Sequence, residues 1–208
     1  MPEIIAPMDI EKRSMEIISE TLGSRVLAPE NEAVIKRVIH STADFDFADT
    51  LTFSEHAVSK GIEALQSGCD IVTDTQMAKA GINKRILASL GGEVHCFMSD
   101  PDVAEEAKAR GITRAAVSME KAAKLTKPCI YAIGNAPTAL FALRELIDSG
   151  QLNAALIIAV PVGFVNVVES KELIIASSIP YIAARGRKGG SPVAAAICNA
   201  MLYRIRRD

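Results

Sequence analysis

The sequence predicts an α/β fold, a three-layer α/β/α arrangement in which helices cover both faces of a mostly parallel five-stranded sheet. From about residue 69 onward, short apolar runs alternate with helix-like stretches, as βαβ units require. The run at 155–160 is almost entirely apolar, which is typical of a strand buried on both faces. Aromatic residues make up only 4% of the chain and Trp is absent, which suits helices packed on a sheet better than an aromatic-lined sandwich.

Length and charge narrow the class of protein further. The 208 residues, 49% of them hydrophobic, predict one domain spanning 1–208. A net charge of -2 gives no global basic field to attract nucleic acid. The longest apolar run, 154–168, is broken by Pro161, Gly163 and Asn166, so we expect no membrane span. Since no leader-like segment opens the chain and no Cys-x-x-Cys pair occurs, we expect a cytoplasmic protein without a zinc or redox centre.

Three helices are predicted before the first strand. Asp9 is a plausible N-cap for the first, which reaches about Leu22. The second runs over 29–40 and opens with Pro29, a residue suited to a first helical turn. Ser54 is expected to cap the third, over 55–66.

The rest of the chain predicts five strands with helices between and after them. The strands are expected at 69–73, 93–97, 129–133, 155–160 and 179–183. The helices are expected at 79–89, 102–110 with 119–124, 138–149, 166–176 and 191–206. Because ligands of such sheets bind at the carboxyl ends of the strands, the loops there are where we expect the chemistry.

The loop after the last strand gives the strongest signal. Its cations Arg185, Arg187 and Lys188 stand among three glycines, Ser191 can cap the final helix, and Pro192 suits the first helical position. Together these features predict an anion site at a helix N-terminus, for a carboxylate or a phosphate. The alternative is a solvated basic loop. Neither Gly-x-Gly-x-x-Gly nor a Walker A sequence occurs, so a nucleotide cofactor has little support.

Other polar residues are more ambiguous. Asp74 and Asn135 follow strands, where each can contact a ligand or serve as a cap. His95 alternates with apolar neighbours inside a strand and is expected to be a satisfied core or face residue, whereas His56 is expected at the surface. Neither has metal-ligand spacing to other donors, so no metal site is predicted.

The stretch 37–42 carries the candidate catalytic residue. Arg37 and His40 lie three residues apart, on one helical face, at the end of an apolar run and before the acidic and aromatic segment 44–49. The alternative is that His40 only complements the last helical turn. From residue chemistry alone we therefore expect an α/β enzyme for a polyanionic small molecule, with His40 as its acid.

Five stretches of the sequence, in order, carry a family resemblance: IEKRSMEII at 10–18, RVIHS at 37–41, GNAPTAL at 134–140, PVGFV at 161–165 with ESK at 169–171, and RGRKGGS at 185–191. Over essentially its whole length the chain resembles the precorrin-8X methylmutases, or precorrin isomerases, of cobalamin biosynthesis. The resemblance implies an isomerase that moves a methyl group from C-11 to C-12 of precorrin-8, or of its cobalt form, to give hydrogenobyrinate or cobyrinate. It also implies a three-layer fold with five parallel strands, and a homodimer that binds substrate near the subunit interface.

Site residues follow partly from the resemblance and partly from composition. The resemblance implies that His40 is the proton donor and acceptor and that Ser14 and Arg37 contact substrate. Protonation would make the conjugated ring electron-poor and ease methyl migration, and a His near its reference pKa of about 6.5 can give and reclaim a proton. No cofactor is needed for such a shift.

The remaining substrate contacts are assigned from place and charge: Asn135, Arg185, Arg187 and Lys188. Acetate and propionate side chains of a corrin ring would account for these cations. Two other functions stay open, a corrinoid carrier without turnover and an enzyme that binds a phosphorylated substrate at the loop of Arg185. The sequence does not decide whether the substrate carries cobalt, or which subunit supplies each side chain.

Overall fold

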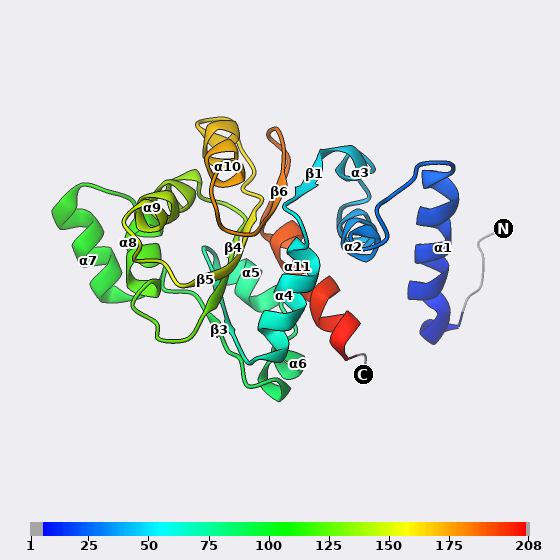
Figure 1. The fold of residues 1–208 in the computed structure, drawn as a ribbon, viewed down its shortest axis with the longest axis horizontal. Helices are drawn as coiled ribbons and strands as arrows, with labels where there is room; N and C mark the ends of the chain where they lie inside the picture. Colours follow the sequence, from blue (N-terminus) through cyan, green and yellow to red (C-terminus); the bar gives the residue numbers. More distant parts are fainter. Residues whose placement is uncertain (1–5, 207–208) are drawn as a thin grey trace.

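The computed structural model describes residues 6–206, and its centre is a six-stranded sheet with helices on both faces (Figure 1). The strand order is β1-β6-β5-β4-β2-β3. All neighbouring strands are parallel except β1, which runs antiparallel to β6. The strands are β1 (Leu51–Phe53), β2 (Asp70–Thr73), β3 (Val94–His95), β4 (Cys129–Ile133), β5 (Ala154–Ala159) and β6 (Tyr181–Ala184).

The prediction of five strands was therefore one short. All five predicted strands are present and parallel, and the one missed is β1, which follows the short helix α3 (Phe47–Thr50). Leu51 pairs with Ala184 and Phe53 with Ile182, so β1 covers the edge that β6 would otherwise expose. Three residues are too few to show an alternating pattern, which is why this strand has no sequence signal.

One face of the sheet carries the larger core cluster. Ile130 and Ala132 of β4 point into it, and α11 contributes a nearly continuous buried run that includes Ala194 and Cys198. At one end of the molecule α1 packs on α2, burying Ile18 (Figure 1). The helices of this side are α1 (Ile10–Leu22), α2 (Glu32–Thr42), α4 (Ala57–Gln66), α5 (Gln76–Gly81), α6 (Lys84–Ser89) and α11 (Ser191–Ile205).

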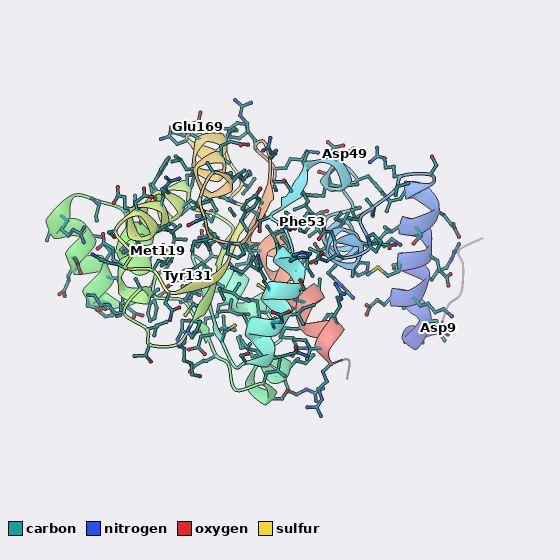
Figure 2. All side chains as sticks on the ribbon, viewed as in Figure 1. Asp9, Asp49, Phe53, Met119, Tyr131 and Glu169 are labelled. Carbon is teal, nitrogen blue, oxygen red and sulfur yellow. The ribbon has the colours of Figure 1, made fainter. Side chains whose placement is uncertain are left out.

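The other face has its own core. Along β4, Tyr131 and Ile133 alternate with Ile130 and Ala132, so their side chains point to this face. They pack here with Met119 of α8, and Figure 2 shows Met119 and Tyr131 close together. The helices of this side are α7 (Pro101–Arg110), α8 (Arg114–Ala122), α9 (Pro137–Asp148) and α10 (Val167–Ile175). Helices on both faces of one sheet confirm the predicted three-layer α/β/α architecture.

Several predicted helix starts were wrong. The helix expected from Pro29 begins at Glu32, and the one expected at 55–66 begins at Ala57. Ser54 does not cap that helix, because its Oγ accepts the backbone N–H of Tyr181 at 2.9 Å. Asp9 stands at the N-cap position of α1 but makes no capping hydrogen bond.

The final helix shows the same kind of error. Ser191 is its first residue and Gly190 its N-cap, so Ser191 is not the cap. The Ser191 Oγ instead lies 2.7 Å from Oγ1 of Thr75, at the end of β2. In both cases a hydroxyl expected to act locally bonds to a segment far away in the sequence.

Strand order also locates the place where ligands usually bind. Leaving out β1, the order β3-β2-β4-β5-β6 changes direction between β2 and β4, which makes a topological switch point at their carboxyl ends. Within residues 6–206, no helix is both long and apolar enough to cross a membrane.

Candidate functional site

A buried carboxylate occupies the switch point. Asp74, which follows β2 and is 0% exposed, accepts the backbone N–H groups of Gly134, Asn135 and Ala136 at 2.9, 2.8 and 2.6 Å. Burial raises the pKa of Asp74, and these three donors oppose the rise. Asp74 was expected either to contact a ligand or to cap the next helix, and it does neither. Thr75 caps α5, and the Asp74 carboxylate binds backbone N–H groups. Asp74 thus connects the loop after β4 to the end of β2.

The loop that Asp74 holds carries Asn135 and contacts the start of α11. Asn135 itself is exposed. A Cβ on Gly134 would lie 2.7 Å from Cα of Ser191, so only glycine allows this close approach of the two backbones. The loops after β2, β4 and β6 therefore form one packed edge.

The basic loop, residues 185–190, lies against the segment after β5. The Gly190 N–H donates to the carbonyl of Val160 at 2.8 Å, and the Gly163 N–H donates to the carbonyl of Arg187 at 3.2 Å. A Cβ on Gly189 would lie 2.1 Å from the Val160 oxygen. The glycines of this loop are needed for close packing as well as for turning.

The three cations of the basic loop differ in their partners. Lys188 Nζ lies 2.6 Å from a carboxylate oxygen of Asp44 and 2.6 Å from one of Asp46. These hydrogen bonds raise the pKa of Lys188, and the bond from Lys188 holds the pKa of Asp44 below its ordinary value. Arg185 lies 3.5 Å from Glu172. Arg187 is exposed and bonds to no side chain that the structure describes.

His40 lies in the last turn of α2, beside the residues that Lys188 binds. The helix continues to Thr42 and ends at Ala43, whose N–H donates to the Ile39 carbonyl at 2.7 Å. The His40 side chain is exposed and makes no hydrogen bond within residues 6–206. Since Asp44 is four residues further along, its bond to Lys188 brings the basic loop to the end of the helix that carries His40.

Arg37 takes part in a different set of contacts. Its Nη2 lies 2.6 Å from Oε1 of Glu11, its guanidinium stacks 5.1 Å from the ring centroid of Tyr203, and its side chain is only 15% exposed. It lines a pocket of about 280 Å³ between α1, α2 and α11. Ser14, on α1, donates its hydroxyl to the Ile10 carbonyl at 2.9 Å. The pocket is lined by Met15, Ser19, Ala33, Lys36, Arg37, Ala200, Tyr203 and Arg204.

Six of the seven predicted site residues fall into two groups, and the seventh, Asn135, is on the loop that Asp74 holds. Arg185, Arg187 and Lys188 share the basic loop, which reaches through Lys188 the segment directly after the helix of His40, whereas Ser14 and Arg37 belong to the contact of α1 with α2. The two groups share α2, since Arg37 and His40 are one turn apart.

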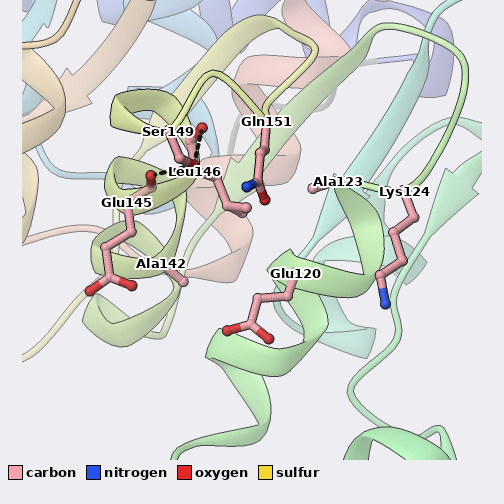
Figure 3. Close-up of a pocket in the computed structure, with 8 residues that line it drawn as sticks. All are labelled: Glu120, Ala123, Lys124, Ala142, Glu145, Leu146, Ser149 and Gln151. Carbon is pink, nitrogen blue, oxygen red and sulfur yellow. Dashed lines mark hydrogen bonds between the residues drawn. The ribbon is translucent and has the colours of Figure 1, made fainter.

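A larger pocket, of about 530 Å³, lies on the other side of the sheet between α8 and α9 (Figure 3). Two of its polar side chains have partners: the Ser149 hydroxyl donates to the carbonyls of Glu145 and Leu146, and Glu120 pairs with Arg110. None of the predicted site residues lines it.

The other two histidines have structural contacts. His95 Nε2 lies 3.1 Å from Oδ2 of Asp70, and its ring stacks on Phe97 with centroids 5.8 Å apart. This confirms His95 as a satisfied face residue. His56 is exposed at the N-cap of α4, as expected of a surface residue.

Sequence reasoning missed the role of Lys171. This residue of α10 is 0% exposed, and its Nζ donates to the carbonyls of Gly186 and Lys188, each at 2.8 Å. Burial lowers its pKa to about 8. Lys171 stands in the polar run Glu169 to Glu172 of the sequence, so nothing local marked it as buried, and its partners could not be read from the sequence.

Comparison with known proteins gives one consistent answer. The family model described as precorrin-8X methylmutase matches residues 9–204. The chain is 48% identical to the cobalt-precorrin-8 methylmutase of Salmonella typhimurium over 99% of both chains. It is 44% identical to that of Priestia megaterium, over 96% of this chain and 89% of the relative.

A solved structure agrees with the sequence relatives. The precorrin-8x methyl mutase of Thermus thermophilus superposes with a TM-score of 0.85 at 36% identity, covering 94% of this chain and 96% of that one. Family model, relatives and fold coincide over nearly the whole length. This chain belongs to the precorrin-8X methylmutase family.

Proposed function

We propose that this chain is the isomerase that moves a methyl group from C-11 to C-12 of a precorrin-8 ring in cobalamin biosynthesis. The observation that carries the proposal is the match of the precorrin-8X methylmutase family model to residues 9–204. The relatives described above are also named methylmutases. A methylmutase catalyses an intramolecular transfer, so the reaction consumes no second substrate and needs no redox partner.

In this proposal His40 gives a proton to the macrocycle and takes it back. Its imidazole is exposed and makes no hydrogen bond to a described residue, so it is available to a bound ring. It lies in the last turn of α2, beside the loop whose lysine binds Asp44. Proton delivery by a positioned side chain typically contributes about 10²–10⁴ in rate.

The proposed substrate contacts are cations and polar groups that suit the acetate and propionate side chains of the ring. Arg185 and Arg187 are exposed on the basic loop. Arg37 and Lys188 are held by carboxylates of the chain, and a substrate carboxylate would exchange with Glu11 or with Asp44 and Asp46. The full set is Ser14, Arg37, Asn135, Arg185, Arg187 and Lys188.

The proposal includes a homodimer that works in the cytoplasm. Large apolar side chains are exposed beside the basic loop, at Phe164 (85%) and Val165 (77%), and on α1, at Ile10 (53%). Apolar surface of this kind is commonly covered by a partner subunit. Sedimentation of the purified protein at micromolar concentration would test the dimer, and a single monomer boundary would contradict it.

We further propose cobalt-precorrin-8 as the preferred substrate. Both relatives described above carry that name, at 48% and 44% identity. The metal would be held by the macrocycle and enter with it.

The decisive experiment mixes purified protein with precorrin-8 and, separately, with cobalt-precorrin-8. Methyl migration changes the conjugation of the ring, so the absorption spectrum should shift with time and the product should match cobyrinate or hydrogenobyrinate. Binding without any spectral change for either substrate would refute the isomerase and support a carrier. Absence of tetrapyrrole binding, together with thermal stabilisation by a sugar phosphate, would refute both.

A further inference from the structure

The side chain of Lys171 is an unusual group to find inside this protein. It is 0% exposed, yet no carboxylate of residues 6–206 lies within ion-pair distance of its Nζ. Its two hydrogen bonds go to backbone carbonyls, those of Gly186 and Lys188. Burying an ammonium without a counter-charge is costly, and an apolar side chain of the same length would pack in α10 without that cost. The charge therefore calls for a role other than packing.

The acceptors of Lys171 stand on either side of Arg187. The carbonyls of Gly186 and Lys188 each accept from Nζ at 2.8 Å, and the carbonyl between them accepts the Gly163 N–H at 3.2 Å. Three successive carbonyls of the basic loop are thus held by donors from other segments. Gly186 itself has a φ of +78°, a left-handed conformation that glycine adopts without strain.

The loop held in this way reaches the helix of His40. Lys188, whose carbonyl Lys171 binds, extends its own side chain to Asp44 and Asp46, directly after α2. A continuous set of contacts therefore runs from α10 through the basic loop to the end of α2.

We infer that Lys171 is a positioning residue for the methyl-transfer site, holding the basic loop so that Arg187 and Lys188 stand beside the end of α2 and can bind substrate carboxylates. The inference rests on the proposed function, because it assigns substrate binding to this loop. Lys171 itself is buried and acts through the loop.

The test is Lys171→Met, which keeps the length of the side chain and removes both donors. We expect KM for cobalt-precorrin-8 to rise about tenfold or more while kcat per folded molecule stays within about twofold. Brief trypsin treatment of the native protein, followed by mass spectrometry, should show cleavage after Arg185, Arg187 or Lys188 at least about tenfold faster than in the wild type. Lys127→Met is the matched control, because Lys127 also donates to a carbonyl, that of Gly91 at 2.9 Å, away from this loop. It should change neither measurement.

The outcomes separate this inference from the proposed function. A folded Lys171→Met protein with wild-type KM and wild-type tryptic protection overturns the inference. So does a variant with less folded protein but unchanged KM, since that result describes a purely structural role. If the wild type turns over neither substrate but Lys171→Met still exposes the loop to trypsin, the proposed function fails and the tethering stands. If Lys171→Met does not fold, Lys171→Gln, which keeps two shorter amide donors, undergoes the same measurements.

Discussion

Lys188 and Asp44 lie 144 residues apart in the sequence, yet the Nζ of one is 2.6 Å from an Oδ2 of the other. The pair is partly exposed, so it adds only about 0–1 kcal/mol to stability. Its importance is geometric, because it fixes the basic loop next to the segment that follows α2. The pair thereby places the basic loop, with Arg185, Arg187 and Lys188, next to the end of the helix that carries the candidate acid His40.

Replacing His40 by Ala should lower kcat by about 10²–10⁴-fold and leave binding intact. The imidazole is expected to transfer a proton, a contribution of about 10²–10⁴ in kcat, while the cations hold the substrate. The spectral shift of cobalt-precorrin-8 measures turnover, and titration with product measures affinity. Near-normal kcat in the variant would move the acid to another residue.

Replacing Arg37 by Ala should weaken substrate binding by about 1.5–3 kcal/mol, the usual value of a charge-assisted hydrogen bond. Because Arg37 also pairs with Glu11 and stacks on Tyr203, the variant loses packing too. Glu11→Gln is the matched control, since it weakens the ion pair and keeps the guanidinium. The control should bind product at least as tightly as wild type, and an Arg37→Ala protein with unchanged Kd would disprove the contact.

Replacing Asp74 by Asn should destabilise the fold by at least about 1–3 kcal/mol. An amide nitrogen would face at least one of the three N–H groups that the carboxylate now accepts, and each buried donor left unpaired costs about 1–3 kcal/mol. Urea unfolding measures the change. Asp148→Asn, an exposed carboxylate paired with Arg144, is the control and should cost under about 1 kcal/mol. An Asp74→Asn protein as stable as this control would show that the Asp74 carboxylate is not needed to hold the loop after β4.

Lys171 should make stability depend on alkaline pH. Its pKa is lowered from 10.5 to about 8 in the folded protein, so the unfolded chain binds the extra proton between these values. The free energy of unfolding should therefore rise with pH through this window, by up to about 3 kcal/mol at 1.4 kcal/mol per tenfold. This gain in unfolding free energy is complete above about pH 10.5 and is lost as pH falls through 8.

The measurement is the difference in unfolding free energy between wild type and Lys171→Met at pH 7.5, 9 and 10.5. Burial raises the pKa of Cys69 and of Cys129 to about 12, which lowers stability above pH 9 in both proteins alike. Taking the difference removes that effect. The unfolding free energy of wild type, minus that of Lys171→Met, should increase as pH rises from 7.5 to 10.5. If this difference stays constant, the pKa of Lys171 is not lowered in the folded protein.

Much of the fold was predictable because it depends on local patterns. The buried run of β5 and the alternation of strands with helices gave five parallel strands and a three-layer architecture, all confirmed by the structure. The partly buried position of His95 followed from its place among alternating apolar residues. The family resemblance, carried by five short stretches, is confirmed by the match over residues 9–204.

The errors have a common cause. Ser54 bonds to Tyr181, 127 residues away, and Ser191 to Thr75, 116 residues away, so neither caps its own helix. β1 exists only because β6 offers an edge to pair with. Local sequence patterns carry no information about a hydrogen-bond partner that comes close only after folding.

The sequence by itself determined the layered α/β fold, the family, and which residues are candidates for the chemistry. Only the tertiary structure decided what those residues contact: that Asp74 fastens the loop of Asn135, that Lys188 reaches the end of α2, and that Lys171 holds the basic loop from inside. The reason is physical. Apolar periodicity is a property of neighbouring residues, whereas a buried polar group takes whichever partner the packed chain brings within hydrogen-bond distance.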